Sequence, residues 1–184
     1  GDHVWKDAPS DDELFKPFFY LDGVTNYDVY GSMGSTGYAG PDNVHKYYRT
    51  QYNWKLRSNR DKCAFIPAVS PGFNDRGVRL AADHKPLSRR LTPASPEGSL
   101  FAEGLQHAIK LVDETAQNML IVNSFNEWHE DSQIEPIANS PTTTTPFDLT
   151  EGLEYEAYGD LYLRLLRNAT VDPSHDDGYA NFPN

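Results

Sequence analysis

Two glutamates three positions apart are the residues of this chain best suited to acid–base chemistry. Glu127 and Glu130 lie in the segment 123–136, which runs N-S-F-N-E-W-H-E-D-S-Q-I-E-P. Cleavage of a glycosidic bond uses a carboxylic acid that protonates the leaving oxygen and a second carboxylate at the sugar. Trp128 offers an apolar face to a sugar ring, and Asn126 offers a hydrogen bond to a hydroxyl. If the chain turns tightly here, the pattern favours a glycosidase site.

The same residues allow two other interpretations. An E-x-x-E pattern also occurs in solvated acidic loops, and the chain is acidic overall. A metal site could be built from His129, Glu130 and Asp131. Adjacent residues of an extended strand, however, point to opposite faces, and the chain has no HExxH motif. We therefore expect neither a metal nor a cofactor at this site.

A short apolar run directly before the glutamates predicts the strand that positions them. Residues 119–122, M-L-I-V, have the length and branching of a buried strand. Residues 18–24 predict a loop that leads into a strand, and residues 65–69 predict another. A strand that ends in carboxylates, an amide and aromatic rings is typical of α/β barrels, which build their sites at the carboxyl ends of the strands.

Three helices are predicted from apolar residues at helical spacing. The first opens at Pro41 and is expected to share one buried face among Val44, Tyr47, Tyr48 and Tyr52. The second spans 98–117, with Phe101, Leu105, Ala108, Ile109 and Val112 on one stripe. The third spans 154–167 and is expected to bury Tyr158, Leu161, Tyr162, Leu165 and Leu166. Strands that alternate with helices indicate an α/β protein.

Composition and length set limits on partners and on architecture. A net charge of -11 argues against nucleic acid and anionic membranes as partners, and no apolar run is long enough to span a bilayer. A complete (β/α)₈ barrel takes roughly 250 residues, whereas this chain has 184. Three strands cannot close a barrel. We expect a fragment, with a partial barrel domain at 1–170 and an irregular tail at 171–184.

The motifs of the chain resemble those of glycoside hydrolase family 99, the endo-α-1,2-mannosidases. The segment S-F-N-E-W-H-E at 124–130, followed by Q-I-E at 133–135, is similar to the signature of that family. Upstream, F-I-P-A-V-S-P-G-F at 65–73 with Arg79, and D-G at 22–23 with Tyr27, are similar to its preceding strands and loops. The resemblance covers about 22–167 and implies the C-terminal portion, three to four βα units, of a (β/α)₈ TIM-type barrel.

The resemblance also implies a chemistry and its residues. Glu127 would deprotonate the 2-hydroxyl of mannose, which then displaces the leaving group to form a 1,2-anhydro sugar. Glu130 would act first as general acid and then as base towards water, so that configuration is retained. Asn126, Trp128, Arg79 and Tyr27 would bind substrate. The expected partners are a mannose-containing N-glycan or mannan-type oligosaccharide and an N-terminal half-barrel, on the same precursor or on another chain.

One position departs from the family pattern. The family usually has Gly-Thr after the second glutamate, and this chain has Asp131-Ser132. Aspartate tolerates a left-handed backbone better than most residues but less well than glycine. The sequon Asn168-Ala169-Thr170 marks a glycosylation site if the chain is secretory, and the resemblance implies the secretory pathway (Golgi lumen) or the extracellular space. The alternative function is a non-catalytic relative that binds glycans or serves a structural role.

Overall fold

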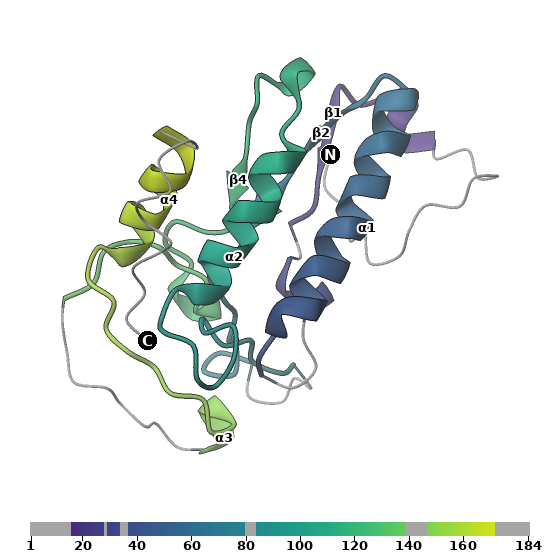
Figure 1. Cartoon of the computed structure of the whole chain (residues 1–184). Coiled ribbons are helices and arrows are strands. Elements are labelled where there is room, and N and C mark those ends of the chain that lie inside the picture. The colour runs from purple at the N-terminus through teal and green to yellow at the C-terminus, as the bar shows by residue number, and fades with distance from the viewer. Residues whose placement is uncertain (1–15, 28, 34–36, 80–83, 139–146, 172–184) are drawn as a thin grey trace.

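The computed structural model describes residues 16–27, 29–33, 37–79, 84–138 and 147–171 as an α/β arrangement (Figure 1). Its strands are β1 (Gly23–Thr25), β2 (Ala64–Ile66), β3 (Ala68–Val69) and β4 (Ile121–Val122). Its α-helices are α1 (Gly40–Arg60), α2 (Ser99–Ala108), α3 (Phe147–Thr150) and α4 (Leu161–Val171). Short 3₁₀ turns lie at η1 (Lys16–Phe19), η2 (Tyr30–Ser32), η3 (Ile109–Leu111), η4 (Glu114–Ala116) and η5 (Trp128–Glu130).

The described strands form three parallel runs, as the sequence predicts. β1 pairs with β2, with Val24 opposite Phe65, and β3 pairs with β4, with Ala68 opposite Ile121. Only Pro67 separates β2 from β3, and proline has no N–H to contribute to a ladder. The predicted strand 65–69 is therefore confirmed as two short pieces, one pairing with the strand before it and the other with the strand after it. The described strands do not close a barrel.

A row of helices covers these strands. α2 packs between α1 and α4, α1 packs on β2, and α2 packs on β3. Between α1 and the strands lies one apolar cluster that includes Val44, Tyr48 and Ala68. A second cluster joins α2 to α4 through Phe101 and Tyr162. The predicted packing faces of the helices are thus largely confirmed, and the strand ends are held by two cores.

None of the described helices has the length and apolarity needed to cross a membrane.

The structure corrects one predicted core residue and one predicted strand. Tyr52 is 48% exposed, and Gln51 takes the buried position one turn after Tyr47 and Tyr48. In the apolar run 119–122, only residues 121–122 are extended, and Met119 and Ile121 are exposed. β4 is an outer strand among the described strands, and the sheet face that Ile121 points to is not covered by a helix there.

Two predicted helices have different bounds. The helix expected at 98–117 ends after η3, because Val112 adopts an extended conformation and Asp113 caps the next turn by accepting the Thr115 N–H at 2.9 Å. The helix expected at 154–167 begins only at Leu161, after Gly159 with a left-handed φ of 58°. α4 extends to Val171, and the remainder of the predicted irregular tail lies outside the described residues.

Candidate active site

The ends of the three strand runs meet at one edge. Asn123, the first residue after β4, donates its backbone N–H to the carbonyl of Val69 at 2.8 Å. Its side-chain Nδ2 donates to the carbonyl of Tyr27, in the loop after β1, also at 2.8 Å. Asn123 is 3% exposed, so these bonds are shielded from water. The expected site edge at the carboxyl ends of the strands is thereby formed.

Glu127 begins the one-turn helix that follows. Its backbone N–H donates to Ser124 Oγ at 2.9 Å, and the Ser132 N–H donates to its carbonyl at 3.3 Å. Its own carboxylate caps η5 by accepting the His129 N–H at 3.2 Å, and the His129 ring Nδ1 lies 3.4 Å from the same oxygen. The tight turn expected between the two glutamates is therefore present. The Glu127 side chain is 41% exposed.

Glu130 is held from outside its own turn. Arg79 Nη2 lies 3.0 Å from Glu130 Oε1, and the Asn74 N–H donates to the Glu130 carbonyl at 2.7 Å. The other Arg79 nitrogen, Nη1, pairs with Asp75 Oδ2 at 2.7 Å. These two hydrogen bonds raise the pKa of the Arg79 guanidinium. A planar guanidinium that bridges two carboxylates fixes the orientation of both.

Asp75 is the buried support of this bridge. Its carboxylate is 1% exposed and also lies 2.6 Å from His84 Nδ1. Burial acts to raise the pKa of Asp75, but the hydrogen bonds from His84 and Arg79 outweigh it and lower that pKa below its ordinary value. Arg79 was predicted to bind substrate, and the loop 70–79 places it against the second glutamate.

The neighbouring acidic residues contact different partners. Glu127 bonds within its own turn, Glu130 contacts Arg79, and Asp131 contacts Arg89. Within the described ranges, no three histidine, cysteine or acidic side chains are grouped so as to hold a metal ion. The geometry of this turn thus offers acid–base groups and hydrogen bonds, and it gives no support to the alternative of a metal site.

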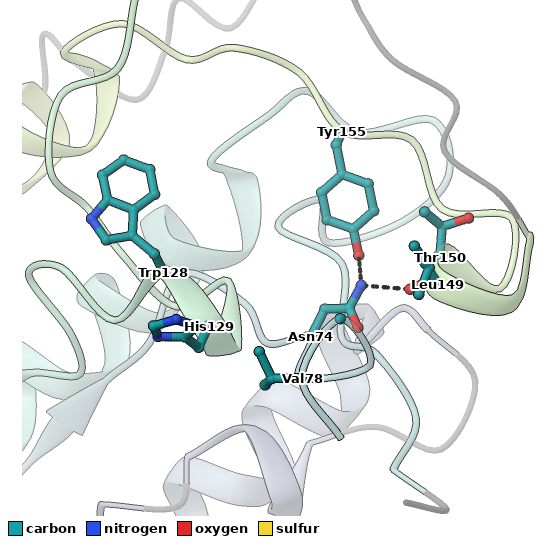
Figure 2. A pocket seen from close by; sticks show the side chains of 8 residues that line it. Asn74, Val78, Trp128, His129, Leu149, Thr150 and Tyr155 are labelled. Atoms are coloured by element: carbon teal, nitrogen blue, oxygen red, sulfur yellow. Dashed lines mark hydrogen bonds between the residues drawn. The ribbon is translucent and has the colours of Figure 1, made fainter. Parts of the chain in front are cut away.

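An open cleft of about 320 Å³ lies beside η5 (Figure 2). Trp128 and His129 form one side of it, and Asn74 and Tyr155 lie across from them. Asn74 Nδ2 donates to the Tyr155 hydroxyl at 2.6 Å and to the Leu149 carbonyl at 2.9 Å. The remaining lining residues are Gly77, Val78, Leu149 and Thr150. Aromatic faces beside amide and hydroxyl groups are the lining that suits a sugar.

The predicted substrate-binding residues divide into two groups. Trp128 lines the cleft, with its Nε1 donating to Glu135 Oε2 at 3.1 Å. Arg79 contacts Glu130, and Arg79 and the two glutamates border the cleft without being among the residues that line it. Tyr27 and Asn126 are exposed and lie outside the set of residues that line this cleft. Their contacts with substrate stay predictions. The acceptor of the sequon, Asn168, is exposed on α4, where the Thr170 hydroxyl donates to the Leu166 carbonyl at 2.8 Å.

The sequence analysis missed one side of the cleft. Leu149, Thr150 and Tyr155 come from a segment that was predicted in part as helix. Gly152 and Gly159 both have positive φ values and lie on either side of Tyr155. Two glycines around an aromatic residue were the available signal for a loop rather than a helix.

The amino-acid sequence is similar to those of known mannosidases. A rat glycoprotein endo-alpha-1,2-mannosidase is 30% identical over 141 residues, which are 70% of this chain and 27% of that protein. A human glycoprotein endo-alpha-1,2-mannosidase-like protein is also 30% identical over 141 residues, covering 28% of its length. The chain therefore spans little more than a quarter of the curated relatives that it matches.

Solved structures show the same partial coverage. A glycoside hydrolase-like protein superposes with a TM-score of 0.54 at 21% identity, over 80% of this chain and 37% of the other, which indicates a shared fold. A GH99 endo-alpha-mannosidase from Bacteroides thetaiotaomicron gives a TM-score of 0.49 at 25% identity, over 80% and 36%. The sequence model of glycosyl hydrolase family 99 matches residues 19–172 of this chain. With most of its length covered by that match, the chain belongs to glycosyl hydrolase family 99.

Proposed function

We propose that this chain carries the catalytic edge of a retaining, endo-acting α-1,2-mannosidase that cleaves N-glycan or mannan-type oligosaccharides. Membership of the family and the names of the relatives support the substrate class. The observation that carries the proposal is the placement of Glu130, which Arg79 holds beside an open cleft, three residues after Glu127 on the same turn. Two carboxylates and an aromatic face just after the carboxyl end of a strand suit glycoside cleavage.

The proposed reaction uses the oxygen of the substrate as nucleophile. Glu127 takes the proton of the mannose 2-hydroxyl while O2 attacks C1, and Glu130 donates a proton to the departing glycosidic oxygen. This forms a 1,2-anhydro sugar. Water, deprotonated by Glu130, then attacks C1 and breaks its bond to O2, which regains a proton from Glu127. Two inversions at C1 give net retention, without a covalent bond between sugar and enzyme.

The other predicted residues have supporting roles in this proposal. Arg79 holds the Glu130 carboxylate on the turn that borders the cleft, and Trp128, which lines the cleft, stacks against a sugar ring. Asn126 and Tyr27 contact sugar hydroxyls. The described strand runs form one side of a (β/α)₈ barrel. The other side comes from an N-terminal half-barrel, on the same polypeptide or on another chain.

The same proposal includes a location. We place the protein in the secretory pathway, in the Golgi lumen, or in the extracellular space, with a glycan on Asn168. The exposure of Asn168 on α4 is compatible with that modification. Treatment of the secreted protein with an amidase that removes N-glycans, followed by a measurement of its mass, tests this point.

The decisive experiment measures turnover on an α-1,2-linked mannose oligosaccharide, with the full-length polypeptide that carries this chain. Glu127→Gln and Glu130→Gln should each lower kcat by at least about 100-fold, while calorimetry still detects binding. Glu103→Gln, which changes a carboxylate on the surface of α2, is the control and should keep the parent rate. NMR of the first-formed anomer should show retention. Absence of turnover by the parent, even with a complementing N-terminal half, would contradict the proposal.

A non-catalytic glycan-binding or structural relative is the second candidate. It is favoured by the open arrangement of the described strands and by the exposure of Glu127, whose side chain is 41% exposed. Under this alternative, calorimetry detects the oligosaccharide and no product forms. Glu127→Gln and Glu130→Gln would then change affinity only.

A further inference from the structure

The residue directly after Glu130 is tied to a buried arginine on a distant part of the chain. Asp131 ends η5 with a left-handed backbone, φ 48° and ψ 33°. Its Oδ1 lies 3.1 Å from Arg89 Nη2 and 3.3 Å from Arg89 Nε. Arg89 Nη2 also donates to the carbonyls of Asp131, at 2.9 Å, and of Gln133, at 3.0 Å. One guanidinium thus binds three acceptors in the two residues on either side of Ser132.

Arg89 is itself firmly seated. Its side chain is 5% exposed, and its guanidinium carbon lies 5.0 Å from the ring centres of both Tyr158 and Tyr162. The Tyr162 hydroxyl donates to Glu97 Oε1 at 2.6 Å, which places a second carboxylate in the same buried network. Burial acts to lower the pKa of Arg89, but Asp131, Tyr162 and Glu97 raise it, so the guanidinium stays charged. A buried charge with this set of partners has little freedom to move.

The loop 70–79 also packs closely against Arg89. A Cβ added at Gly72 would lie 2.9 Å from Arg89 Cγ and 2.9 Å from the Leu87 carbonyl oxygen. Two residues later, the Asn74 N–H donates to the Glu130 carbonyl at 2.7 Å. The loop 70–79 therefore holds Glu130 through a backbone bond on one side, and it packs against the partner of Asp131 on the other.

We propose that the buried Arg89 and its partner Asp131 form a clamp that positions Glu130 against Arg79, so that Arg89 and Asp131 are both positioning residues for the reaction. The clamp fixes the direction in which the chain leaves η5. A three-residue turn such as η5 has too few hydrogen bonds of its own to fix the Glu130 carboxylate against Arg79. The expected effect of the clamp on kcat rests on the proposed function. Its expected effect on hydrogen exchange in the turn rests on the observed contacts alone.

The alternative explanation of Asp131 is a backbone role only, since aspartate is one of the few residues that accept a left-handed conformation. Asp131→Gly separates the two explanations. Glycine adopts a φ of 48° without steric cost, so a backbone role predicts a variant as good as the parent or better. A clamp predicts a loss, because the carboxylate that Arg89 binds is gone. Asp131→Asn keeps an oxygen acceptor and loses the charge, and it should fall between the parent and Asp131→Gly.

The test measures kcat, KM and amide hydrogen exchange in the segment 124–134 for the full-length polypeptide. Asp131→Gly should lower kcat by about 10- to 100-fold, leave KM close to the parent value, and speed exchange in 124–134. Arg89→Lys, which keeps the charge and loses the fork, should act in the same direction. The matched control is Asp61→Asn, which breaks the pair between Asp61 and the equally buried Arg57 at the other end of the strands. It should change stability and leave kcat and exchange in 124–134 unchanged.

The outcomes separate the clamp from the proposed function. Parent kcat or parent exchange rates in Asp131→Gly would overturn the clamp, even if the parent enzyme is fully active. If the parent shows no turnover, the proposed function fails. Exchange then decides the clamp by itself: faster exchange in 124–134 supports it, and unchanged exchange overturns it.

Discussion

The two glutamates of the site are held in opposite ways. Glu130 is 15% exposed, is paired with Arg79, and has its carbonyl bound by the Asn74 N–H. Glu127 is 41% exposed, and its carboxylate bonds to His129 within its own turn. Among the described residues, the Glu127 carboxylate therefore bonds within its own turn, whereas Glu130 is held by the loop 70–79, which follows the preceding strand.

This difference follows from the arrangement of the strands. Glu130 faces the side on which the loop after β3 packs, and that loop contributes both Arg79 and Asn74 to its contacts. Glu127 has no comparable support from the described residues, as expected if the proposed N-terminal half-barrel covers that side. The comparison teaches that contacts within the described residues are enough to hold Glu130, in a chain that spans about a quarter of its relatives.

The largest effect is expected from removing the guanidinium that holds Glu130. Arg79→Met keeps an unbranched stem and loses the contacts with both Asp75 and Glu130. A carboxylate misplaced by about 1 Å costs up to about 100-fold in rate, so kcat should fall by that order, with a smaller change in KM. Steady-state kinetics on an α-1,2-mannose substrate measure this.

Arg76→Met is the matched control for Arg79→Met. Arg76 lies in the same loop but pairs with Glu151, at 2.6 Å, rather than with a proposed catalytic residue. Its kcat should stay near that of the parent. Equal losses in the two variants would show that the loop, and not the contact with Glu130, determines the rate.

The next largest effect is expected on the free energy of unfolding, from a substitution in the loop that holds Glu130. Gly72→Ala places a methyl group 2.9 Å from the Leu87 carbonyl oxygen and from Arg89 Cγ, and overpacking of this kind costs about 1–3 kcal/mol of unfolding free energy. Gly77→Ala, where nothing lies within 4 Å, should leave stability unchanged. Denaturant unfolding of both variants checks this pair. A similar loss in both would mean that the tight contact at Gly72 has no energetic weight.

Much of the turn that carries Glu130 could be predicted, because the sequence features that indicate it are local. The apolar run 119–122 indicated the strand, and the spacing of Glu127 and Glu130 indicated a turn that presents both. The family pattern has glycine at position 131, and the left-handed φ of Asp131 confirms the backbone requirement behind that glycine. Each of these features depends on neighbours within a few residues.

The parts that sequence reasoning missed depend on contacts between distant segments. Asp131 and Arg89 are 42 positions apart, and Asn74 and Tyr155 are 81 apart. Tyr155 belongs to a stretch whose apolar spacing indicated helix, yet α4 begins only at Leu161, after the left-handed Gly159, and Tyr155 lines the cleft. At Tyr52, helical spacing was compatible with two faces, and packing against the strands selected Gln51 instead.

A smaller effect is expected at the face of the cleft beside Glu127. Trp128→Ala removes an aromatic face, and such contacts contribute about 0.5–1.5 kcal/mol, so KM should rise about two- to tenfold with little change in kcat. Phe125→Ala is the control, since Phe125 is exposed on the same turn and lies outside the set of residues that line the cleft. A KM that rises equally in both variants would assign the effect to the turn instead of to the stacking face.

The smallest effect is a change in the acid dependence of stability. Asp75 has a pKa below its ordinary 3.8, because hydrogen bonds from His84 and Arg79 outweigh burial, which acts to raise it. The folded protein therefore binds fewer protons than the unfolded chain in that range. The contribution of Asp75 is complete above its ordinary value and is lost as pH falls through its lower folded value. Below about pH 4, the Tm of Asp75→Asn should fall less steeply than that of the parent.

Asp113→Asn makes this last prediction specific to the site. The pKa of Asp113 is also lowered, because hydrogen bonds from Thr115 outweigh burial, but Asp113 caps η4 before β4 and does not contact Arg79. Both variants should flatten the acid limb of a plot of Tm against pH. Only Asp75→Asn should also lower kcat at neutral pH, since only Asp75 anchors the arginine that holds Glu130. If both variants keep the parent kcat, the pair of Asp75 and Arg79 adds stability alone, and the support of Glu130 comes from the other contacts of the turn.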